Sequence, residues 1–226
     1  MIYITGDTHI PVDISKLSTK QFPDQRNMTK DDFLIITGDF GGVWDNSNEE
    51  KYWIKWLNEK NFTTLFVDGN HENFDMLNSY QIENYHGGKV HKIANSIYHL
   101  MRGQIFEFDG SLFFTMGGAS SHDKEYRIEG KSWWEAELPN NEEYQEAENN
   151  LDKVNRKVDY IITHCAPDSI QRILADWYEH DKLTNFLESI SWSVEYKKWF
   201  FGHYHFNHIV DDKHVLLYDQ IIKLTK

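Results

Sequence analysis

Five short polar clusters, each directly after an apolar run, contain the residues of this chain that could do chemistry. Their donor side chains are two aspartates, one asparagine and five histidines. Nitrogen and oxygen donors of this kind suit borderline-to-hard divalent metal ions. Polar groups at the ends of buried strands are also where open α/β sheets place their chemistry. The clusters are Gly6-Asp7-Thr8-His9, Gly38-Asp39-Phe40-Gly41-Gly42, Gly69-Asn70-His71-Glu72, Thr163-His164-Cys165 and Gly202-His203-Tyr204-His205.

The spacing inside two clusters indicates shared ligation. Asp7 and His9 are two residues apart, as are His203 and His205. Side chains at i and i+2 of an extended segment point to the same side, so each pair can reach one ion. Cys165, the only cysteine, is expected to be a small buried residue without a chemical role. Three further histidines match no ligand pair and are not expected to bind metal: His86, His91 and His99.

Apolar, β-favouring runs predict the strands that must position these clusters. Strands are expected at 2–5, 33–37, 62–67, 159–163 and 198–201, each ending just before a cluster. Continuous apolar runs are typical of strands buried on both faces. The early alternation of strands with helices implies a parallel sheet with right-handed crossovers.

The remaining elements follow from turn and helix signals. An Asp109-Gly110 turn between strands 104–108 and 111–116 predicts a hairpin that opens a second sheet. A capping box from Ser47 to Glu50 predicts a helix that packs through Trp53, Trp56 and Leu57. Other expected helices are a short one at 14–19, one from residue 73, one at 142–158 with an apolar stripe, and two within 168–190 separated near 179–181. Short closing strands are expected at 206–210, 214–218 and 220–224.

The order of the clusters, D-x-H, D, N-H, H, H-x-H, resembles the calcineurin-like metallophosphoesterases, in particular small bacterial or phage-type members. The resemblance extends from Asp7 to His205. It implies a four-layer α/β/β/α sandwich of two mixed sheets flanked by helices. The length of 226 residues is most simply a single domain spanning 1–226.

The resemblance also implies two divalent metal ions, with Mn²⁺ expected first and Fe, Zn²⁺ or Ni²⁺ as alternatives. One ion would take Asp7, His9, Asp39 and His205, and the other Asp39, Asn70, His164 and His203. Asp39 would bridge the ions, and a hydroxide between them would attack the phosphate ester. His71 would protonate the leaving oxygen or position the phosphoryl group. Glu72 and Asp75 are both candidates to orient His71, or are acidic residues that favour the start of the next helix.

The function that this implies is a metal-dependent phosphoric ester hydrolase that acts on a small phosphodiester or phosphomonoester. Three alternatives are a metal-dependent nuclease of the same fold, a protein phosphatase, and a non-catalytic metal-binding scaffold. Gly42-Val43-Trp44 stands where protein Ser/Thr phosphatases carry an Asp-Arg pair, which argues against a protein phosphatase. A scaffold would be expected to lack a ligand or the histidine of Gly-Asn-His-Glu, and neither is missing.

The segment from Ser120 to Trp134 is the predicted substrate rim. Arg127 and Lys131 would supply positive charge, and Trp133 would stack on a nucleotide-like substrate, a contact worth about 1–3 kcal/mol per base. The alternative is an ordinary loop in which Trp133 and Trp134 pack as a small satellite core.

Composition sets the remaining expectations. The formal net charge of −13 argues against strong, phosphate-led binding of nucleic acid, which needs a basic surface. The chain runs from Met1 directly into a strand without a signal peptide, and no apolar run is long enough for a membrane span. One cysteine permits no intrachain disulfide, so a cytoplasmic location is expected. The sequence indicates no oligomeric state.

Overall fold

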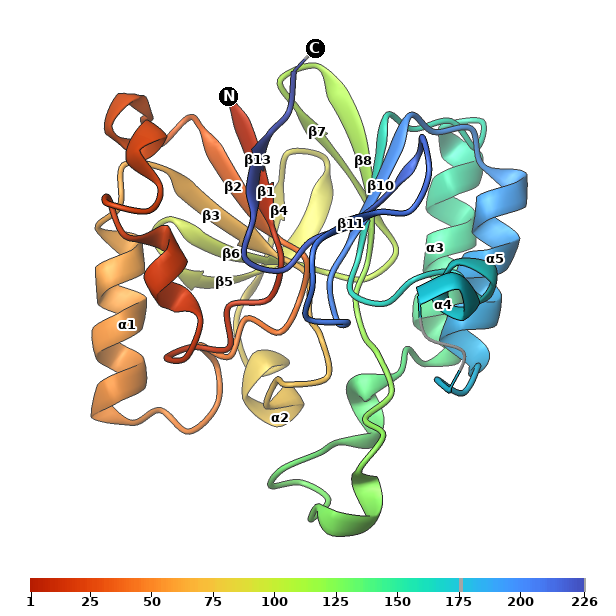
Figure 1. Cartoon of the computed structure of the whole chain (residues 1–226), viewed down its shortest axis with the longest axis horizontal. Coiled ribbons are helices and arrows are strands. Elements are labelled where there is room, and N and C mark those ends of the chain that lie inside the picture. The colour runs from red at the N-terminus through yellow and green to blue at the C-terminus, as the bar shows by residue number, and fades with distance from the viewer. Residues whose placement is uncertain (175–176, 226) are drawn as a thin grey trace.

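Two mixed β-sheets lie between outer helices in the computed structural model, which describes residues 1–174 and 177–225 (Figure 1). One sheet has seven strands in the order β13-β1-β2-β3-β6-β5-β4, and the other has six in the order β11-β12-β10-β9-β8-β7. This architecture confirms the predicted α/β sandwich. The first sheet contains β1 (Ile2–Thr5), β2 (Phe33–Ile36), β3 (Thr63–Phe66), β4 (Ile82–Tyr85), β5 (Gly88–Ala94), β6 (Ile97–Leu100) and β13 (Ile221–Lys223), and the second contains β7 (Gln104–Phe108), β8 (Ser111–Met116), β9 (Tyr160–Thr163), β10 (Lys198–Phe201), β11 (His208–Ile209) and β12 (His214–Leu216).

The centre of each sheet is parallel, and this parallel pairing gathers the polar clusters at one edge. Strands β1, β2, β3 and β6 run parallel, with Thr5 opposite Ile36 and Ile36 opposite Phe66. Strands β8, β9, β10 and β12 also run parallel. The carboxyl ends of β1, β2 and β3 are therefore level, as ligand sites in open α/β sheets require.

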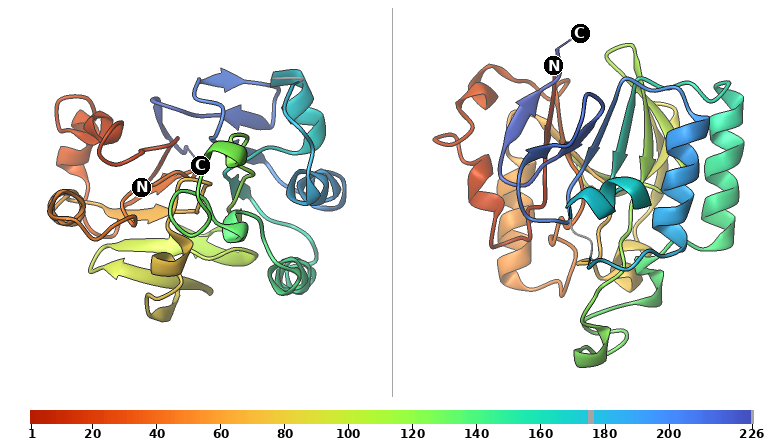
Figure 2. Two further views of the ribbon diagram at one scale, coloured as in Figure 1. Left: turned by 90° about the horizontal axis from the view of Figure 1, so that it is seen from below. Right: turned by 45° about the vertical axis from the view of Figure 1, so that its right-hand side comes forward.

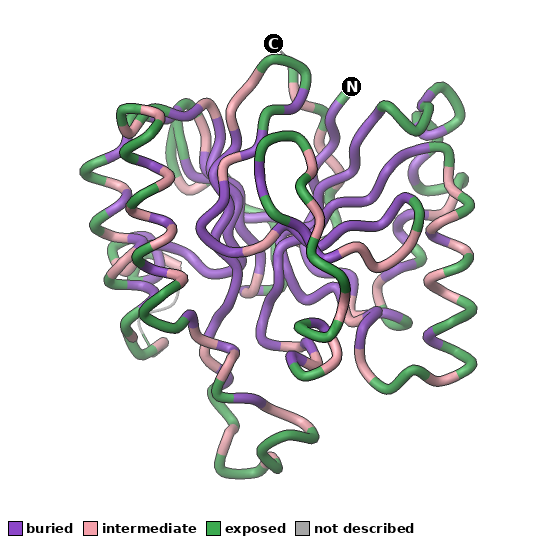
Figure 3. The backbone as a smooth tube through the Cα atoms, turned by 180° about the vertical axis from the view of Figure 1, so that it is seen from behind, coloured by how far each residue is buried: buried purple, intermediate pink, exposed green. Residues whose placement is uncertain are grey.

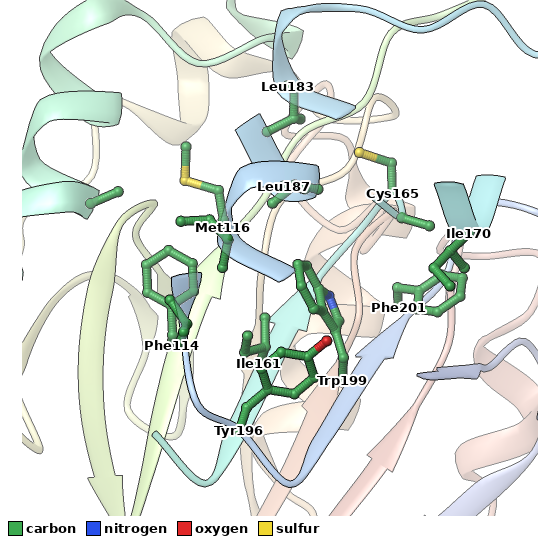
Figure 4. Close-up of a cluster of buried hydrophobic side chains, with 14 of the residues drawn as sticks. Phe114, Met116, Ile161, Cys165, Ile170, Leu183, Leu187, Tyr196, Trp199 and Phe201 are labelled. Carbon is green, nitrogen blue, oxygen red and sulfur yellow. The ribbon is translucent and has the colours of Figure 1, made fainter. Parts of the chain in front are cut away.

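Three buried clusters correspond to the three interfaces between the layers. On β2, Phe33 and Ile35 face the space between the sheets, whereas Leu34 and Ile36 join the cluster on the helix side. This explains the continuous apolar runs, because both faces of each central strand are buried. Figure 4 shows part of the cluster between the six-stranded sheet and its helices, where Trp199 and Phe201 of β10 pack with Leu187 of a covering helix. Cys165 is buried in the same cluster, as expected.

The helices cover the outer faces of the two sheets (Figures 1 and 2). The seven-stranded sheet is covered by α1 (Asn48–Asn58) and by 3₁₀ helices at Ile14–Leu17 and Pro23–Asn27. The six-stranded sheet is covered by α3 (Asn141–Lys153), α4 (Asp168–Leu174) and α5 (Lys182–Ser193). The short helix α2 (Phe74–Leu77) follows the Gly-Asn-His-Glu cluster. The predicted pair of helices within 168–190 is present, with residues 175 and 176 lying outside the described residues.

Two helix predictions need correction. The capping box at Ser47 is only half formed: Ser47 Oγ accepts from the backbone N–H of Glu50 at 3.2 Å, but the Glu50 carboxylate accepts from the backbone of residues 44–46 instead. That carboxylate thus satisfies three donors of the preceding loop. The helix predicted to reach residue 158 ends at Lys153, because Asn155 and Arg156 both have a left-handed φ of 53° that reverses the chain.

Strands β4, β5 and β6 were not predicted for residues 81–104. Strand β6 runs parallel to β3, and β4 and β5 form an antiparallel extension beyond it, with Val90 of β5 opposite Glu83 on one side and Leu100 on the other. Every residue of β4 is at least partly exposed to solvent. Its sequence therefore lacks the continuous apolar run that marks the central strands.

The segment between β8 and α3, residues 117–140, extends beyond the sheets at the end that carries α2 (Figure 1). Seen from that end, it lies over the middle of the molecule (Figure 2). The tip of this segment is exposed, whereas the central strands β1, β2, β3 and β9 are buried along their length (Figure 3). None of the described helices has the length and hydropathy needed to cross a membrane.

Candidate metal centre

Four of the predicted ligands form a tight cluster at the shared edge of the sheets. Asp7, His9, Asp39 and His205 each bring one nitrogen or oxygen atom to within 4.8 Å of the others. Asp7 follows β1, Asp39 follows β2 and His205 follows β10, so the ends of strands from both sheets meet here. The donors are carboxylate oxygens and imidazole nitrogens, a set suited to a divalent cation.

Asp39 lies between this cluster and the remaining ligands. Its Oδ2 is 3.1 Å from His9 Nε2, while its Oδ1 is 3.4 Å from His164 Nε2 and accepts from the backbone N–H of His71 at 2.8 Å. The carboxylate is buried and presents one oxygen to each side. This is the arrangement that a bridging carboxylate needs.

Within the described part of the chain, two buried atoms on the far side of Asp39 have no hydrogen-bond partner. They are Asn70 Oδ1 and His164 Nε2. The other polar atom of each side chain is held, because Asn70 Nδ2 donates to Ser121 Oγ at 3.2 Å and His164 Nδ1 lies 2.8 Å from the Thr37 carbonyl. Ligands whose second polar atom is fixed in this way are oriented for a metal, and an unpaired buried acceptor otherwise costs free energy. The residues present therefore fit a second ion.

His203 completes this second group from β10. Its ring centroid is 5.0 Å from that of His164, and its backbone N–H lies 3.2 Å from each carboxylate oxygen of Asp7. The structure thus brings all seven predicted ligands to one edge, with the first group more tightly converged than the second.

The ionisable groups of the cluster shift one another's pKa values. Burial raises the pKa of Asp7 in spite of the nearby His164. Burial also disfavours the charged form of Asp39, but the charge of His164 and contacts with other histidines hold the pKa of Asp39 well below its usual range. Burial would lower the pKa of His164, but the Asp39 carboxylate outweighs it and raises that pKa to about 9. Carboxylates and imidazoles bound in this way exchange protons for a metal when one is present.

Four of the predicted ligands have left-handed backbone conformations. The φ angles are 35° at His9, 43° at Asp39, 74° at His203 and 56° at His205. Such conformations are uncommon for residues other than glycine and cluster at functional sites, where the surrounding structure enforces them. They turn the chain sharply after each strand so that the ligands face inward.

Two glycines allow the ligands to approach neighbouring backbone. A Cβ at Gly69 would lie 2.1 Å from Asp39 Oδ1, and one at Gly38 would lie 2.1 Å from His164 Nδ1. Gly38 also has a φ of +107°, which side chains rarely adopt. Any side chain at either position would displace a predicted ligand.

His71 lies beside the first group of ligands. Its ring centroid is 5.5 Å from that of His9, and burial lowers its pKa although the Asp39 carboxylate opposes this. Neither candidate orienting residue contacts its ring. Glu72 accepts from the backbone N–H of Phe40 at 2.7 Å, and Asp75 accepts from the indole N–H of a tryptophan at 3.0 Å.

The predicted rim residues have different surroundings. The Arg127 guanidinium lies 2.7 Å from Asp123 and is close enough to His71 for its charge to contribute, after burial and Asp39, to the pKa of that histidine. Lys131 is exposed. Trp133 lies under the Lys124 ammonium, 5.0 Å from the ring centroid, and lines a cavity of about 960 Å³ whose lining contains none of the seven ligands.

Trp134 is a core residue, as the packing alternative expected. It is 5% exposed and packs edge-on against Trp44, with ring centroids 5.4 Å apart. Its indole N–H donates to Asp75, so it joins the segment between β8 and α3 to helix α2.

Three residues that were not among the predicted site residues also lie next to the ligands. Asp13 Oδ2 is 2.8 Å from His9 Nδ1, and the ring of His122 lies 5.8 Å from that of His203. Tyr218 stacks on His205, with ring centroids 5.3 Å apart. Only the i,i+4 spacing of His9 and Asp13 was accessible to inspection of the sequence, because the other contacts join distant segments.

The two-sheet sandwich and its carboxylate–imidazole cluster define a metal-dependent phosphoesterase, and comparison with known proteins agrees. The family model described as calcineurin-like phosphoesterase matches residues 1–207, so the chain belongs to that family. The protein is thus a hydrolase of phosphoric esters with a candidate metal site, and its substrate is phosphorylated. Among the curated proteins, none matches the chain at a significant level.

Proposed function

We propose that this protein hydrolyses a small phosphodiester or phosphomonoester, nucleotide-like in character, with the help of two divalent metal ions, Mn²⁺ first among them. The observation that carries the proposal is the placement of Asp39 between two groups of ligands, one of which includes the unpaired Asn70 Oδ1 and His164 Nε2. Two ions at such a centre would supply a hydroxide nucleophile at neutral pH and neutralise the phosphate oxygens.

The side chains around the ions have separate tasks in this proposal. Asp7, His9 and His205 would hold one ion, Asn70, His164 and His203 would hold the other, and Asp39 would contribute to both sites. His71 is not needed as a ligand, and its ring is free to give a proton to the departing alkoxide. The backbone N–H of His71 fixes its position relative to Asp39.

The rim favours a small substrate with limited negative charge. Arg127 is a rim cation whose charge reaches His71, and it is already paired with Asp123. The chain as a whole has a formal charge of −13, which repels long polyanions at moderate ionic strength. A substrate with one phosphate group and an aromatic or nucleoside portion suits these surroundings.

A substrate panel with added Mn²⁺ tests the proposal. The panel contains bis-nitrophenyl phosphate, nitrophenyl phosphate, cyclic nucleotides, dinucleotides, a phosphopeptide and a short RNA. We expect turnover of small esters that prolonged EDTA treatment abolishes and Mn²⁺ restores, and Asp39→Asn should be the most damaging single ligand replacement. Preference for the phosphopeptide or the RNA would contradict the substrate assignment, and full activity in excess EDTA would contradict the mechanism.

A further inference from the structure

His205 is the most exposed of the seven predicted ligands, so burial restrains its side chain least. Its side chain is 52% exposed, whereas those of Asp7 and Asp39 are 0% and 1% exposed. An imidazole this accessible has several rotamers available, and ordering it on metal binding costs conformational entropy. Its Nε2 lies 3.4 Å from Asp7 Oδ2, and its ring meets that of His9 edge-on, with centroids 5.0 Å apart.

The opposite support for this imidazole is the ring of Tyr218. The two rings are stacked, with centroids 5.3 Å apart and planes inclined by 30°. Tyr218 belongs to the segment between β12 and β13, which follows the part of the chain matched by the family model, residues 1–207. The contact therefore joins a family ligand to a segment outside the family match.

The backbone of Tyr218 is itself fixed to the metal centre. Its N–H donates to Asn207 Oδ1 at 2.8 Å, and its carbonyl accepts from Lys16 Nζ at 2.6 Å. Lys16 is 6% exposed, and the same ammonium donates to the backbone carbonyl of Asp7 at 2.5 Å and to that of Gly6 at 3.0 Å. One buried cation thus ties the tyrosine to the strand end that provides Asp7.

We propose that Tyr218 is a positioning residue of the metal centre, and that its ring holds the His205 imidazole in the orientation in which it binds the first ion. The proposal rests on the proposed function in its assignment of His205 as a ligand. Partners of metal ligands that do not touch the metal typically change its affinity by 10- to 100-fold when they are removed. Loss of the ring should therefore weaken metal binding without unfolding the protein.

The experiment compares Tyr218→Phe, which keeps the ring, with Tyr218→Leu and Tyr218→Gln, which remove it. The matched control is Tyr85→Leu, because Tyr85 is also half-buried and stacked, on Tyr98 at 4.4 Å, but lies on β4. Mn²⁺ is titrated calorimetrically into each metal-free protein, and the thermal unfolding of the metal-free proteins is recorded separately.

We expect Tyr218→Phe and Tyr85→Leu to bind Mn²⁺ within about threefold of wild type, and Tyr218→Leu and Tyr218→Gln to bind one equivalent about 10- to 100-fold more weakly. In a His205→Ala background, Tyr218→Leu should cause no further loss. Unchanged affinity in the non-aromatic variants, an equal loss in Tyr218→Phe, an additional loss in the His205→Ala background, or failure of both non-aromatic variants to fold would each overturn the proposal.

The same data separate this proposal from the proposed function. A wild-type protein that binds Mn²⁺ but hydrolyses no ester of the panel would contradict the proposed function, while the affinity series would still decide the role of Tyr218. A wild-type protein that binds no Mn²⁺ would overturn both.

Discussion

The contact between His71 and Asp39 uses the backbone N–H of His71 and the carboxylate of Asp39, not the His71 imidazole. The His71 N–H donates to Asp39 Oδ1 at 2.8 Å, and the imidazole itself has no partner among Glu72 and Asp75. Replacing the imidazole therefore leaves the contact with Asp39 in place. The role of His71 in proton transfer can be tested separately from metal binding for this reason.

His71→Ala should retain the wild-type Mn²⁺ content and lower kcat by about 10²–10⁴, the range typical of general acid–base catalysis. The loss should be smaller for nitrophenyl esters than for alkyl esters, because a good leaving group needs less protonation. Steady-state kinetics on a matched pair of such esters, with metal analysis of each sample, checks this. An equal loss for both esters would leave His71 as a positioning residue only.

The place of each predicted ligand after a strand could be inferred from the local sequence, whereas the residues that support these side chains could not. Asp7, His9 and the other ligands each follow a strand, so local sequence places them at one sheet edge. The stacking of Tyr218 on His205 depends on the path of the chain after β12, and no local pattern encodes it. The same holds for Ser121, which reaches Asn70 from a segment about fifty residues away in the chain.

At the scale of elements, Arg102 joins three segments behind the metal centre. Its Nε and Nη2 donate to Asp68 Oδ2 at 2.8 and 2.6 Å, and Nη2 also donates to the carbonyl of Ala136 at 2.8 Å. Asp68 follows β3 and precedes the Gly-Asn-His-Glu cluster, while Ala136 lies in the segment between β8 and α3. Both members of the ion pair are buried, and Arg102 holds the pKa of Asp68 far below its usual range against the effect of burial.

Arg102→Met should destabilise the metal-free protein by about 3–5 kcal/mol, because it leaves the Asp68 carboxylate buried without its main partner. The double variant Asp68→Asn, Arg102→Met should recover part of that loss. Urea unfolding measures both. The control is Lys157→Met, which breaks the exposed Lys157–Glu195 pair and should cost less than about 1 kcal/mol. Similar losses in Arg102→Met and the control would contradict the argument.

Elements were predictable where burial on both sides leaves a continuous apolar run. Strands β1, β2 and β10 follow this pattern and lie where they were expected. Strands β4 and β5 do not, because they lie toward the edge of the sheet and carry polar residues among their apolar ones on either side of a His86-Gly87 turn. The end of α3 depended on left-handed residues at 155 and 156, and neither is a glycine that would have indicated the turn.

At the scale of the whole molecule, buried titratable groups outside the metal centre link stability to pH. His91 is 3% exposed and stacks on His99, with centroids 5.2 Å apart and the two Nδ1 atoms 3.0 Å apart. His99 in turn contacts Asp68 at 2.9 Å. Burial, reinforced by the His99 charge and opposed by Asp68, lowers the pKa of His91 to about 4.

This lowered pKa predicts a loss of stability in mild acid. The pKa of an unfolded-state histidine is about 6.5. Between pH 6.5 and 4, His91 is therefore protonated in the unfolded chain but neutral in the folded protein. The free energy of unfolding therefore falls as pH falls through this window, by about 1–3 kcal/mol from this residue, and the effect is complete below pH 4. Above pH 6.5 the residue is neutral in both states and contributes no pH dependence.

His91→Gln should remove this part of the pH dependence. Urea unfolding of the metal-free protein at pH 7.5, 5.5 and 4.5 should show a shallower decline in the variant than in wild type, with the two differing most at pH 4.5. His208→Gln, which replaces an exposed histidine on β11, should keep the wild-type slope. Parallel pH profiles for wild type and His91→Gln would show that the acid sensitivity arises elsewhere, because the variant cannot take up the proton that His91 binds on unfolding.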